Sequence, residues 1–134
     1  MDLVFVDAPC TGTGTWRRCP DAKWRLKERQ LEKRMGEQDE ILAAASAYVK
    51  PGGRLLYATC SFLMEEDEDR VAKFLAAHSE FSEEDAAESA IASGLLTEEG
   101  AALVRKYRGP TGSVRLTPRR AGTDGFFFAV LRRA

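Results

Sequence analysis

The sequence has few residues that could hold a metal ion or build a disulfide framework. It contains three cysteines and one histidine in 134 residues. The cysteines are odd in number and lack paired spacing, and His78 is far from all of them along the chain. This pattern argues against a disulfide scaffold, predicts no metal site, and favours a reducing, cytoplasmic setting.

Long apolar runs are also missing. No stretch approaches the roughly 20 apolar residues that a membrane helix needs. Residues 1–10 lack the basic and apolar regions of a signal peptide. With 44% hydrophobic and 31% charged residues and a net charge of −1, the composition is typical of a soluble globular chain. The length predicts one domain, and we expect no membrane partner.

The charges are unevenly distributed along the chain. Residues 17–34 hold eight Lys and Arg against three Asp and Glu, whereas residues 65–69 are all acidic. A basic segment of this kind is typical of a surface that binds a polyanion. A solvated helix face rich in ion pairs has the same composition, and charge alone favours that second interpretation.

The spacing of apolar residues predicts an α/β fold. Residues 3–6 and 54–60 are apolar runs of the kind found in strands buried on both faces. A helix with Ile41, Leu42, Ala45, Tyr48 and Val49 on its apolar face is expected over residues 36–49. A second helix is expected over residues 65–78, with the acidic run in its first turns. This order predicts a right-handed βαβ unit with parallel strands.

The C-terminal part predicts helices followed by a hairpin. Residues 79–112 predict one or two helices, with Ser82 and Asp85 as a capping box. Residues 113–118 and 125–133 are strand-like. The turn-rich segment between them predicts an antiparallel pair.

Two of the three cysteines occupy the ends of the two predicted parallel strands. Cys10 lies in VDAPCTGTGTW and Cys60 in YATCSF. Ligands of open α/β sheets bind beyond the carboxyl ends of the strands, so neighbouring strands would bring the two thiols together. The glycine-threonine loop lacks the lysine and the spacing of a P-loop. The absence of a C-x-x-C motif disfavours a thiol-redox protein.

These segments together resemble one enzyme family. DAPCTGTG, RRCPDAKWR, VKPGGRLLYATCS, EEDE and DGFFFA extend over nearly the whole chain. They resemble the Sun/Fmu group of bacterial ribosomal RNA cytosine-5 methyltransferases and their nucleolar relatives. The resemblance implies an incomplete class I S-adenosylmethionine-dependent, Rossmann-like methyltransferase fold, with parallel strands plus a C-terminal antiparallel hairpin. We expect residues 1–134 to be the C-terminal part of the catalytic domain, because the relatives' glycine-rich cofactor loop and nucleoside-holding acids are absent.

The resemblance also implies covalent catalysis by two cysteines. Carbon 5 of cytosine is too weak a nucleophile to take a methyl group directly, and addition of a thiolate to carbon 6 activates it. Cys60 would be the nucleophile, and Cys10 would assist release of the adduct. The residues alone leave this assignment open, because DNA cytosine methyltransferases use the cysteine that follows proline as the nucleophile.

Further residues would contact cofactor or substrate by the same resemblance. Asp7 would contact the target base or the methionine end of S-adenosylmethionine, although an acid at a strand end also caps turns. Pro9 would stiffen the loop. Trp16 and Trp24 would stack on bases or pack against the protein. The candidates for RNA phosphate contacts are Arg17, Arg18, Lys23 and Arg25.

Several positions depart from the family pattern or have a structural interpretation. Cys19 stands where relatives commonly have His, and we expect it to take no part in catalysis. Asp67 replaces a common Asn and Met64 a common Pro, and neither changes the two-cysteine chemistry. The pair at 124–125, Asp-Gly, is interpreted as a turn that places the final strand.

The expected function is part of an S-adenosylmethionine-dependent RNA cytosine-5 methyltransferase acting on 16S ribosomal RNA. A tRNA substrate stays open, and we expect the chain alone to be inactive. The alternative is a non-catalytic RNA-binding or assembly module that keeps the fold. The free edge of residues 3–6 further predicts a homodimer, because an unpaired strand edge is a template for a second chain.

Overall fold

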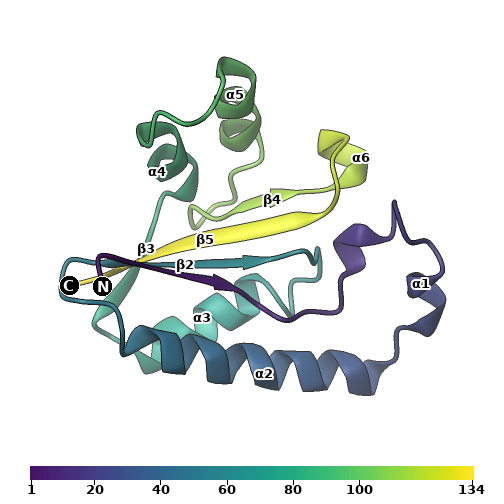
Figure 1. The fold of residues 1–134 in the computed structure, drawn as a ribbon, viewed down its shortest axis with the longest axis horizontal. Helices are drawn as coiled ribbons and strands as arrows, with labels where there is room; N and C mark the ends of the chain where they lie inside the picture. Colours follow the sequence, from purple (N-terminus) through teal and green to yellow (C-terminus); the bar gives the residue numbers. More distant parts are fainter.

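The computed structural model describes residues 1–134 as a mixed five-stranded sheet with helices on both faces (Figure 1). No helix combines the length and apolar character needed to cross a membrane. The elements in chain order are β1 (Leu3–Asp7), η1 (Thr13–Thr15), α1 (Ala22–Arg25), α2 (Glu28–Ser46), β2 (Arg54–Thr59), α3 (Glu68–Ala77), β3 (Phe81–Glu84), α4 (Ala86–Ala92), α5 (Glu98–Lys106), β4 (Val114–Leu116), α6 (Pro118–Ala121) and β5 (Phe126–Arg133).

The sheet has the order β1-β2-β5-β3, with β4 beside β5. β1 pairs with β2 in parallel, and β5 runs antiparallel to its neighbours β2, β3 and β4. The predicted parallel pair and the predicted antiparallel hairpin are both confirmed. The hairpin connection contains the short helix α6 where only turns were expected. Because β1 and β2 are parallel neighbours, their carboxyl ends meet at one edge of the sheet.

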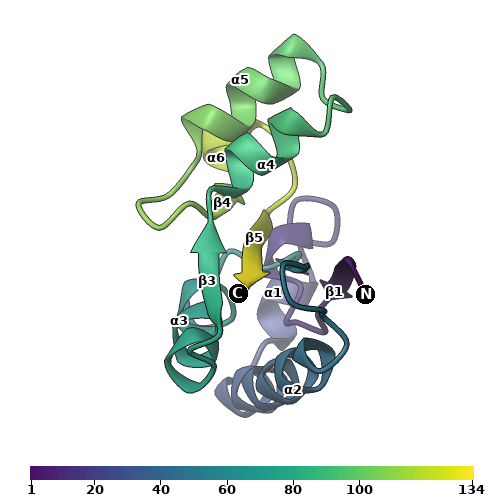
Figure 2. The same cartoon turned by 90° about the vertical axis from the view of Figure 1, so that its left-hand side faces the viewer.

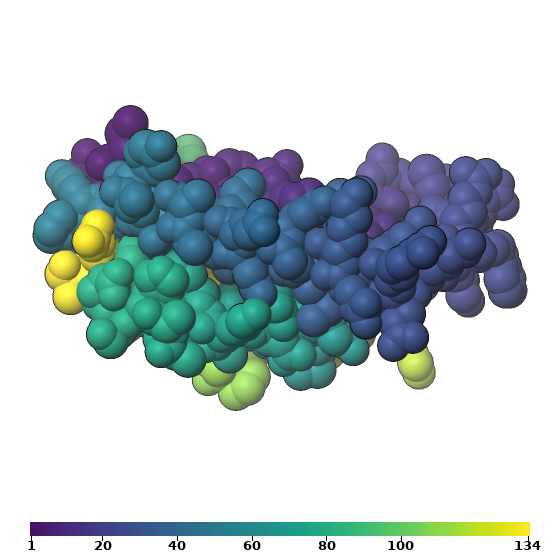
Figure 3. Space-filling model, turned by 90° about the horizontal axis from the view of Figure 1, so that it is seen from below, coloured from purple at the N-terminus to yellow at the C-terminus, as the bar shows by residue number.

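Helices α2 and α3 cover one face of the sheet (Figures 1 and 3). Leu42 of α2 and Phe74 of α3 are buried in one cluster with Leu55, Tyr57 and Phe127 of the sheet. Burial of such side chains is the main favourable contribution to folding. This layer is the hydrophobic core of the chain.

Helix α2 differs from its prediction in both its start and its buried face. It begins at Glu28, before the predicted start at residue 36. Its buried positions are Gln38, Leu42, Ala45 and Ser46, whereas Ile41 and Tyr48, which were expected on the apolar face, are exposed. Leu42, Ala45 and Val49 are buried as predicted, but the core side of the helix is partly polar, so apolar periodicity located it only in part.

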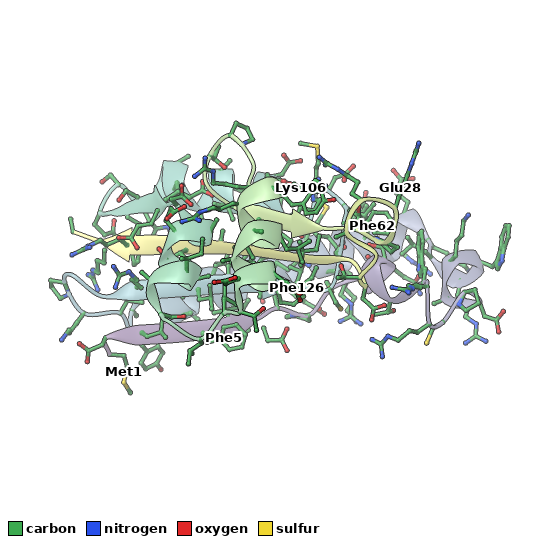
Figure 4. All side chains as sticks on the ribbon, turned by 90° about the horizontal axis from the view of Figure 1, so that it is seen from above. Met1, Phe5, Glu28, Phe62, Lys106 and Phe126 are labelled. Atoms are coloured by element: carbon green, nitrogen blue, oxygen red, sulfur yellow. The ribbon has the colours of Figure 1, made fainter.

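Helices α4 and α5 lie on the opposite face and cover only part of it (Figure 2). Leu3 and Phe5 of β1 are each 58% exposed on this side, and Figure 4 shows Phe5 and Phe126 on the same face. The prediction that residues 3–6 are buried on both faces is therefore wrong. β1 is an edge strand, and only its side toward α2 is packed.

The region after α3 contains a strand that the sequence pattern did not predict. β3 pairs antiparallel with β5, and Ser82 lies opposite Arg132 within it. The predicted capping box is wrong, because Ser82 is in the strand and Asp85 caps α4 by accepting from the Glu88 N–H at 3.0 Å. Glu84 pairs with Arg132 at 3.2 Å, so partners distant in sequence stabilise this polar strand.

Candidate active site

The carboxyl ends of β1 and β2 bring two thiols together. The Sγ atoms of Cys10 and Cys60 are 3.3 Å apart, and both residues are half-buried. In Figure 1, the loops after these two strands project beyond the same end of the sheet. Cys19, the third thiol, is exposed. No group of three or more His, Cys, Asp or Glu side chains is arranged to hold a metal ion.

The two thiols differ in acidity. The hydrogen bond from Cys10 lowers the pKa of Cys60 to about 7, against the opposing effects of burial and of the negative charges of Asp7 and Glu66. The same hydrogen bond, together with burial, raises the pKa of Cys10. Near neutral pH the pair therefore favours a thiolate on Cys60 and a proton on Cys10. A thiolate is the nucleophilic form of cysteine.

The glycine-threonine loop lets three backbone segments meet. The N–H of Gly14 donates to the carbonyl of Cys60 at 2.9 Å, and the N–H of Gly125 donates to the carbonyl of Gly14 at 2.8 Å. A Cβ atom on Gly14 would lie 2.1 Å from the Gly125 carbonyl oxygen, a distance that no side chain could occupy. The Asp-Gly pair at 124–125 therefore anchors the loop beside Cys60 in addition to preceding β5.

Hydroxyl groups fix the backbone around Cys60. Thr59 donates through Oγ1 to Oδ1 of Asp67 at 2.6 Å and accepts from the N–H of Ser61 at 3.2 Å. Burial raises the pKa of Asp67 to about 8, although the bond from Thr59 and the charge of Arg115 act in the opposite direction. Asp67, which departs from the family pattern, is therefore hydrogen-bonded to Thr59, the residue directly before Cys60.

The residue that the sequence analysis missed is Glu66. The acidic run was expected in the first turns of a helix, but α3 begins at Glu68, and both Glu66 and Asp67 are completely buried before it. That prediction is therefore wrong for these two acids. Glu66 accepts hydrogen bonds from Thr11 and Ser61. Ser61 is close to it in sequence, but Thr11 is 55 residues away, so the acidic run by itself carried no signal for the burial of Glu66.

Two of the predicted phosphate contacts brace the loop that follows Cys10. Arg17 donates to the carbonyl of Gly122, and Arg18 pairs with Asp124 at 2.5 Å. Both arginines remain exposed. They connect the segment after η1 to the segment that precedes β5. Each arginine therefore has a partner within the protein, in addition to the RNA phosphate that the sequence analysis predicted for it.

The two tryptophans have different surroundings. Trp16 packs edge-on against Phe62, with ring centroids 5.5 Å apart. Trp24 is 83% exposed, and the ammonium group of Lys23 lies 5.5 Å from its ring. The packing interpretation therefore holds for Trp16, while Trp24 presents an open aromatic surface.

A basic cavity of about 320 Å³ lies beside Cys10. Arg25, Lys33 and Arg34 are among the residues that line it. Only Arg25 was predicted to contact phosphate. Lys33 and Arg34 lie in the first half of α2, which begins earlier than predicted, and Arg34 also pairs with Glu37 at 2.8 Å. The cavity offers three cations next to a thiol.

Asp7 and Pro9 lie between β1 and Cys10. The carboxylate of Asp7 is exposed and has no hydrogen-bond or ion-pair partner, yet its charge acts on Cys60. The carbonyl of Pro9 accepts from Nε2 of Gln38 at 2.8 Å, which ties this loop to α2. Asp7 does not line the basic cavity. A single exposed carboxylate fits one contact to a nucleoside cofactor and does not enclose it.

The fold and the site define the class of the protein: an α/β protein with two thiols at the carboxyl ends of neighbouring parallel strands. Residues 1–132 match the family described as 16S rRNA methyltransferase RsmB/F, and the chain belongs to this family. The predicted family and fold are thereby confirmed.

Individual relatives cover the same range. The chain is 36% identical over 131 residues to ribosomal RNA small subunit methyltransferase B of Erwinia tasmaniensis, which is 98% of this chain and 26% of the relative. The crystal structure of PH0851 has a TM-score of 0.80 at 38% identity and matches 98% of this chain and 26% of that one. A methyltransferase homologue from Pyrococcus horikoshii has a TM-score of 0.68 at 25% identity, over 100% of this chain and 39% of its own. The chain therefore spans about a quarter of the curated relative's length.

Proposed function

We propose that this chain carries the two-thiol part of an RNA cytosine-5 methyltransferase whose substrate is 16S ribosomal RNA. The observation that carries the proposal is the 3.3 Å contact between the Cys10 and Cys60 sulfurs, with the more acidic thiol at Cys60. The names of the curated relatives support the RNA class. The chemistry of cytosine supports the need for two thiols, because one must begin the reaction and a second group must help to end it.

Cys60 begins the reaction. Its thiolate adds to carbon 6 of cytosine, so that a sulfur–carbon bond forms and the electron pair of the carbon 5–carbon 6 double bond makes carbon 5 nucleophilic. S-adenosylmethionine supplies the methyl group that carbon 5 takes. Cys10 keeps its proton during this step and donates it in a hydrogen bond to the Cys60 sulfur. That hydrogen bond favours the thiolate that must attack.

Cys10 assists release. Once Cys60 is a thioether, its sulfur is no longer a thiolate acceptor, so the hydrogen bond that is the main cause of the raised pKa of Cys10 is weakened and the charge of Cys60 no longer adds to it. Cys10 can then lose its proton to solvent and take the proton from carbon 5 of the base. The electron pair of that carbon–hydrogen bond restores the double bond, the sulfur–carbon bond breaks, and Cys60 leaves as a thiolate.

The basic cavity beside Cys10 is the proposed site for the RNA backbone. Arg25, Lys33 and Arg34 line it, and cations of this kind contact phosphate without reading the base. Lys23 and the open ring of Trp24 lie in α1 between Ala22 and Arg25, which line the cavity. Asp7, exposed at the end of β1, is the proposed contact to the target base or the cofactor.

The test uses a complete methyltransferase that contains this segment, incubated with its RNA. Cys60→Ala should abolish methylation. Cys10→Ala should permit methyl transfer and accumulate a covalent RNA–protein adduct, visible as a band of reduced mobility in a denaturing gel. Cys19→Ala is the control and should behave as wild type. An adduct in Cys60→Ala and normal turnover in Cys10→Ala would mean that the two roles are reversed.

The alternative, a non-catalytic RNA-binding or assembly module, has a distinct outcome in the same experiment. RNA binding would persist, and none of the three cysteine variants would change the methylation of the RNA or the amount of covalent adduct. Substitution of Lys33 by Glu would then be the only change with an effect, because it acts on backbone binding.

A further inference from the structure

A carboxylate lies between the two thiol-bearing loops. Glu66 is completely buried. Its Oε1 accepts from the backbone N–H of Thr11 at 2.8 Å and from Nε2 of Gln38 at 3.1 Å. Its Oε2 accepts from the hydroxyl of Thr11 at 2.7 Å and from the hydroxyl of Ser61. Thr11 and Ser61 directly follow the two cysteines, so one side chain holds both loops next to their thiols.

The same residue is anchored from further elements. Gln38 of α2 donates from its single amide nitrogen to Glu66 and to the carbonyl of Pro9, the latter at 2.8 Å. The hydroxyl of Tyr57 in β2 donates to the backbone carbonyl of Glu66 at 2.7 Å. The position of the carboxylate is therefore determined by α2, β2 and both loops together.

The chemistry of the contacts matches a carboxylate. An ionised carboxylate only accepts hydrogen bonds and has about four lone-pair directions, which match the four donors around Glu66. A glutamine has one oxygen. If that oxygen faced the N–H donors, the NH₂ group would face the two hydroxyls, which would have to rotate and accept where they now donate. In the opposite orientation, the NH₂ group would face two N–H donors that have lost their acceptor in a buried place.

We propose that Glu66 is a positioning residue that sets the distance between the Cys10 and Cys60 sulfurs through Thr11 and Ser61. The consequence for catalysis rests on the function proposed above, but the distance itself can be measured without RNA. If the carboxylate is lost, the two loops separate, and the hydrogen bond between the thiols weakens.

Disulfide closure measures how close the thiols are. In the 134-residue chain carrying Cys19→Ser, the Cys60 thiolate attacks glutathione disulfide, forms a mixed disulfide and releases one glutathione thiolate. The Cys10 sulfur then attacks the mixed disulfide, and the second glutathione leaves. The protein is oxidised by two electrons, and one glutathione disulfide becomes two glutathiones. At equilibrium, the ratio of disulfide-closed to reduced protein is measured at known concentrations of glutathione and glutathione disulfide. This ratio gives the effective concentration of one thiol at the other.

Glu66→Gln is compared with Glu65→Gln, a change at the exposed neighbouring acid. We expect the effective concentration to fall by about tenfold or more in Glu66→Gln, because small misplacements of reacting groups have large effects. Glu65→Gln should match its parent. Alkylation of Cys60 by iodoacetamide, followed against pH, should show a midpoint above the value of about 7 in Glu66→Gln and not in Glu65→Gln. The weakened hydrogen bond from Cys10 is the largest influence on the pKa of Cys60, and its loss outweighs removal of the Glu66 charge, which by itself would lower that pKa. A general loss of stability would not move this midpoint in the folded protein.

A second variant covers the case in which Glu66→Gln does not fold. Thr11→Val removes one hydroxyl donor and keeps the backbone N–H contact, so both readouts should move in the same direction by a smaller amount. The proposal is overturned if Glu66→Gln folds and has the same effective thiol concentration and the same alkylation midpoint as Glu65→Gln. If only Thr11→Val folds, the proposal is overturned when both readouts of that variant equal those of its parent. If the thiol readouts change while Cys60→Ala still methylates RNA, the positioning role stands and the proposed catalytic function fails.

Discussion

Two regions of this molecule reverse the usual distribution of polar and apolar side chains. At the carboxyl ends of β1 and β2, Glu66, Asp67 and Ser61 are completely buried. On the open face of the sheet, Leu3 and Phe5 are each 58% exposed. The first region buries groups that usually face water, and the second exposes groups that usually avoid it.

The difference lies in whether each group has a partner within the chain. The buried acids accept hydrogen bonds from side chains that the fold brings to them, so their removal from water is compensated. The open face borders a groove of about 900 Å³ that includes Leu3, Leu56 and Phe128, and nothing in this chain covers it. In the polar region most buried groups are paired, with Oε1 of Gln38 and Nε of Arg115 as the exceptions. The apolar region is typical of an interaction surface.

The largest expected effect is on the polar region. Thr59→Val keeps the side-chain shape but removes the hydroxyl that donates to Asp67 and accepts from Ser61. Two buried groups then lack partners, and we expect the free energy of unfolding to fall by about 3 kcal/mol in urea titrations. Leu3→Ala on the open face should cost less than about 1 kcal/mol. Equal losses would remove the contrast between the two regions.

The next effect is the pH dependence that Asp67 adds. Burial raises its pKa to about 8, with Glu66 and Glu68 adding to the shift and Arg115 and Thr59 opposing it. An acid whose folded pKa is raised keeps its proton when the unfolded chain has lost it, so stability falls as pH rises from about 4 to about 8.

Substitution of the acid tests this sign. Asp67→Asn should remove the pH-dependent loss, so that the variant gains about 1–3 kcal/mol over wild type between pH 5 and pH 8. Thermal or urea unfolding at several pH values measures it. Parallel pH profiles for the two proteins would show that Asp67 is ionised in the folded state, as an acid with an unshifted pKa would be.

A smaller effect is expected at the free edge of β1. The carbonyl of Asp2 and the N–H of Ala8 both face β2, so by alternation the N–H of Phe5 points outward. We predict that two copies associate through these edges in an antiparallel pairing. Phe5→Pro should weaken dimerisation about tenfold, or about 1.4 kcal/mol, and sedimentation velocity measures the change.

Two further variants separate the backbone contribution from the side chain. Phe5→Ala keeps the outward N–H and should retain more of the association than Phe5→Pro. Val4→Pro removes an N–H that faces β2 and should instead lower stability. A wild-type chain that sediments as a monomer at high concentration would refute edge pairing.

The weakest signal is expected for cofactor binding. Among the residues described, Asp7 alone is the predicted contact to S-adenosylmethionine, and it is exposed at the end of the edge strand. One carboxylate supplies little binding energy, so calorimetric titration of the 134-residue chain should give a Kd weaker than about 1 mM. Binding in the micromolar range would mean that the open region is already a complete ligand site.

The parts of the fold that were predicted correctly depend on local patterns. The apolar runs of β1 and β2 and the strands of the hairpin β4–β5 follow from residues close together in sequence. Strand β3 was missed because its stability comes from β5 and from ion pairs such as Arg132 with Glu84. The exposure of Phe5 was missed because periodicity cannot tell an edge strand from a central one.

The candidate site divides in the same way. The motifs pointed to Cys10 and Cys60, and parallel pairing of the strands that precede them accounts for their proximity. Lys33 was missed because its place beside the cavity depends on where α2 begins. Glu66 was missed because two of its donor residues, Thr11 and Gln38, are distant from it in sequence.

By itself the sequence determined the family, the strand–helix order and the identity of the two thiols, because these depend on residue types and their spacing along the chain. Only the tertiary structure decided which thiol is the more acidic, which acid is buried between the loops and which face of the sheet stays open. Acidity depends on burial and on hydrogen-bond direction. Those quantities exist only when distant segments are in contact, and no local pattern contains them.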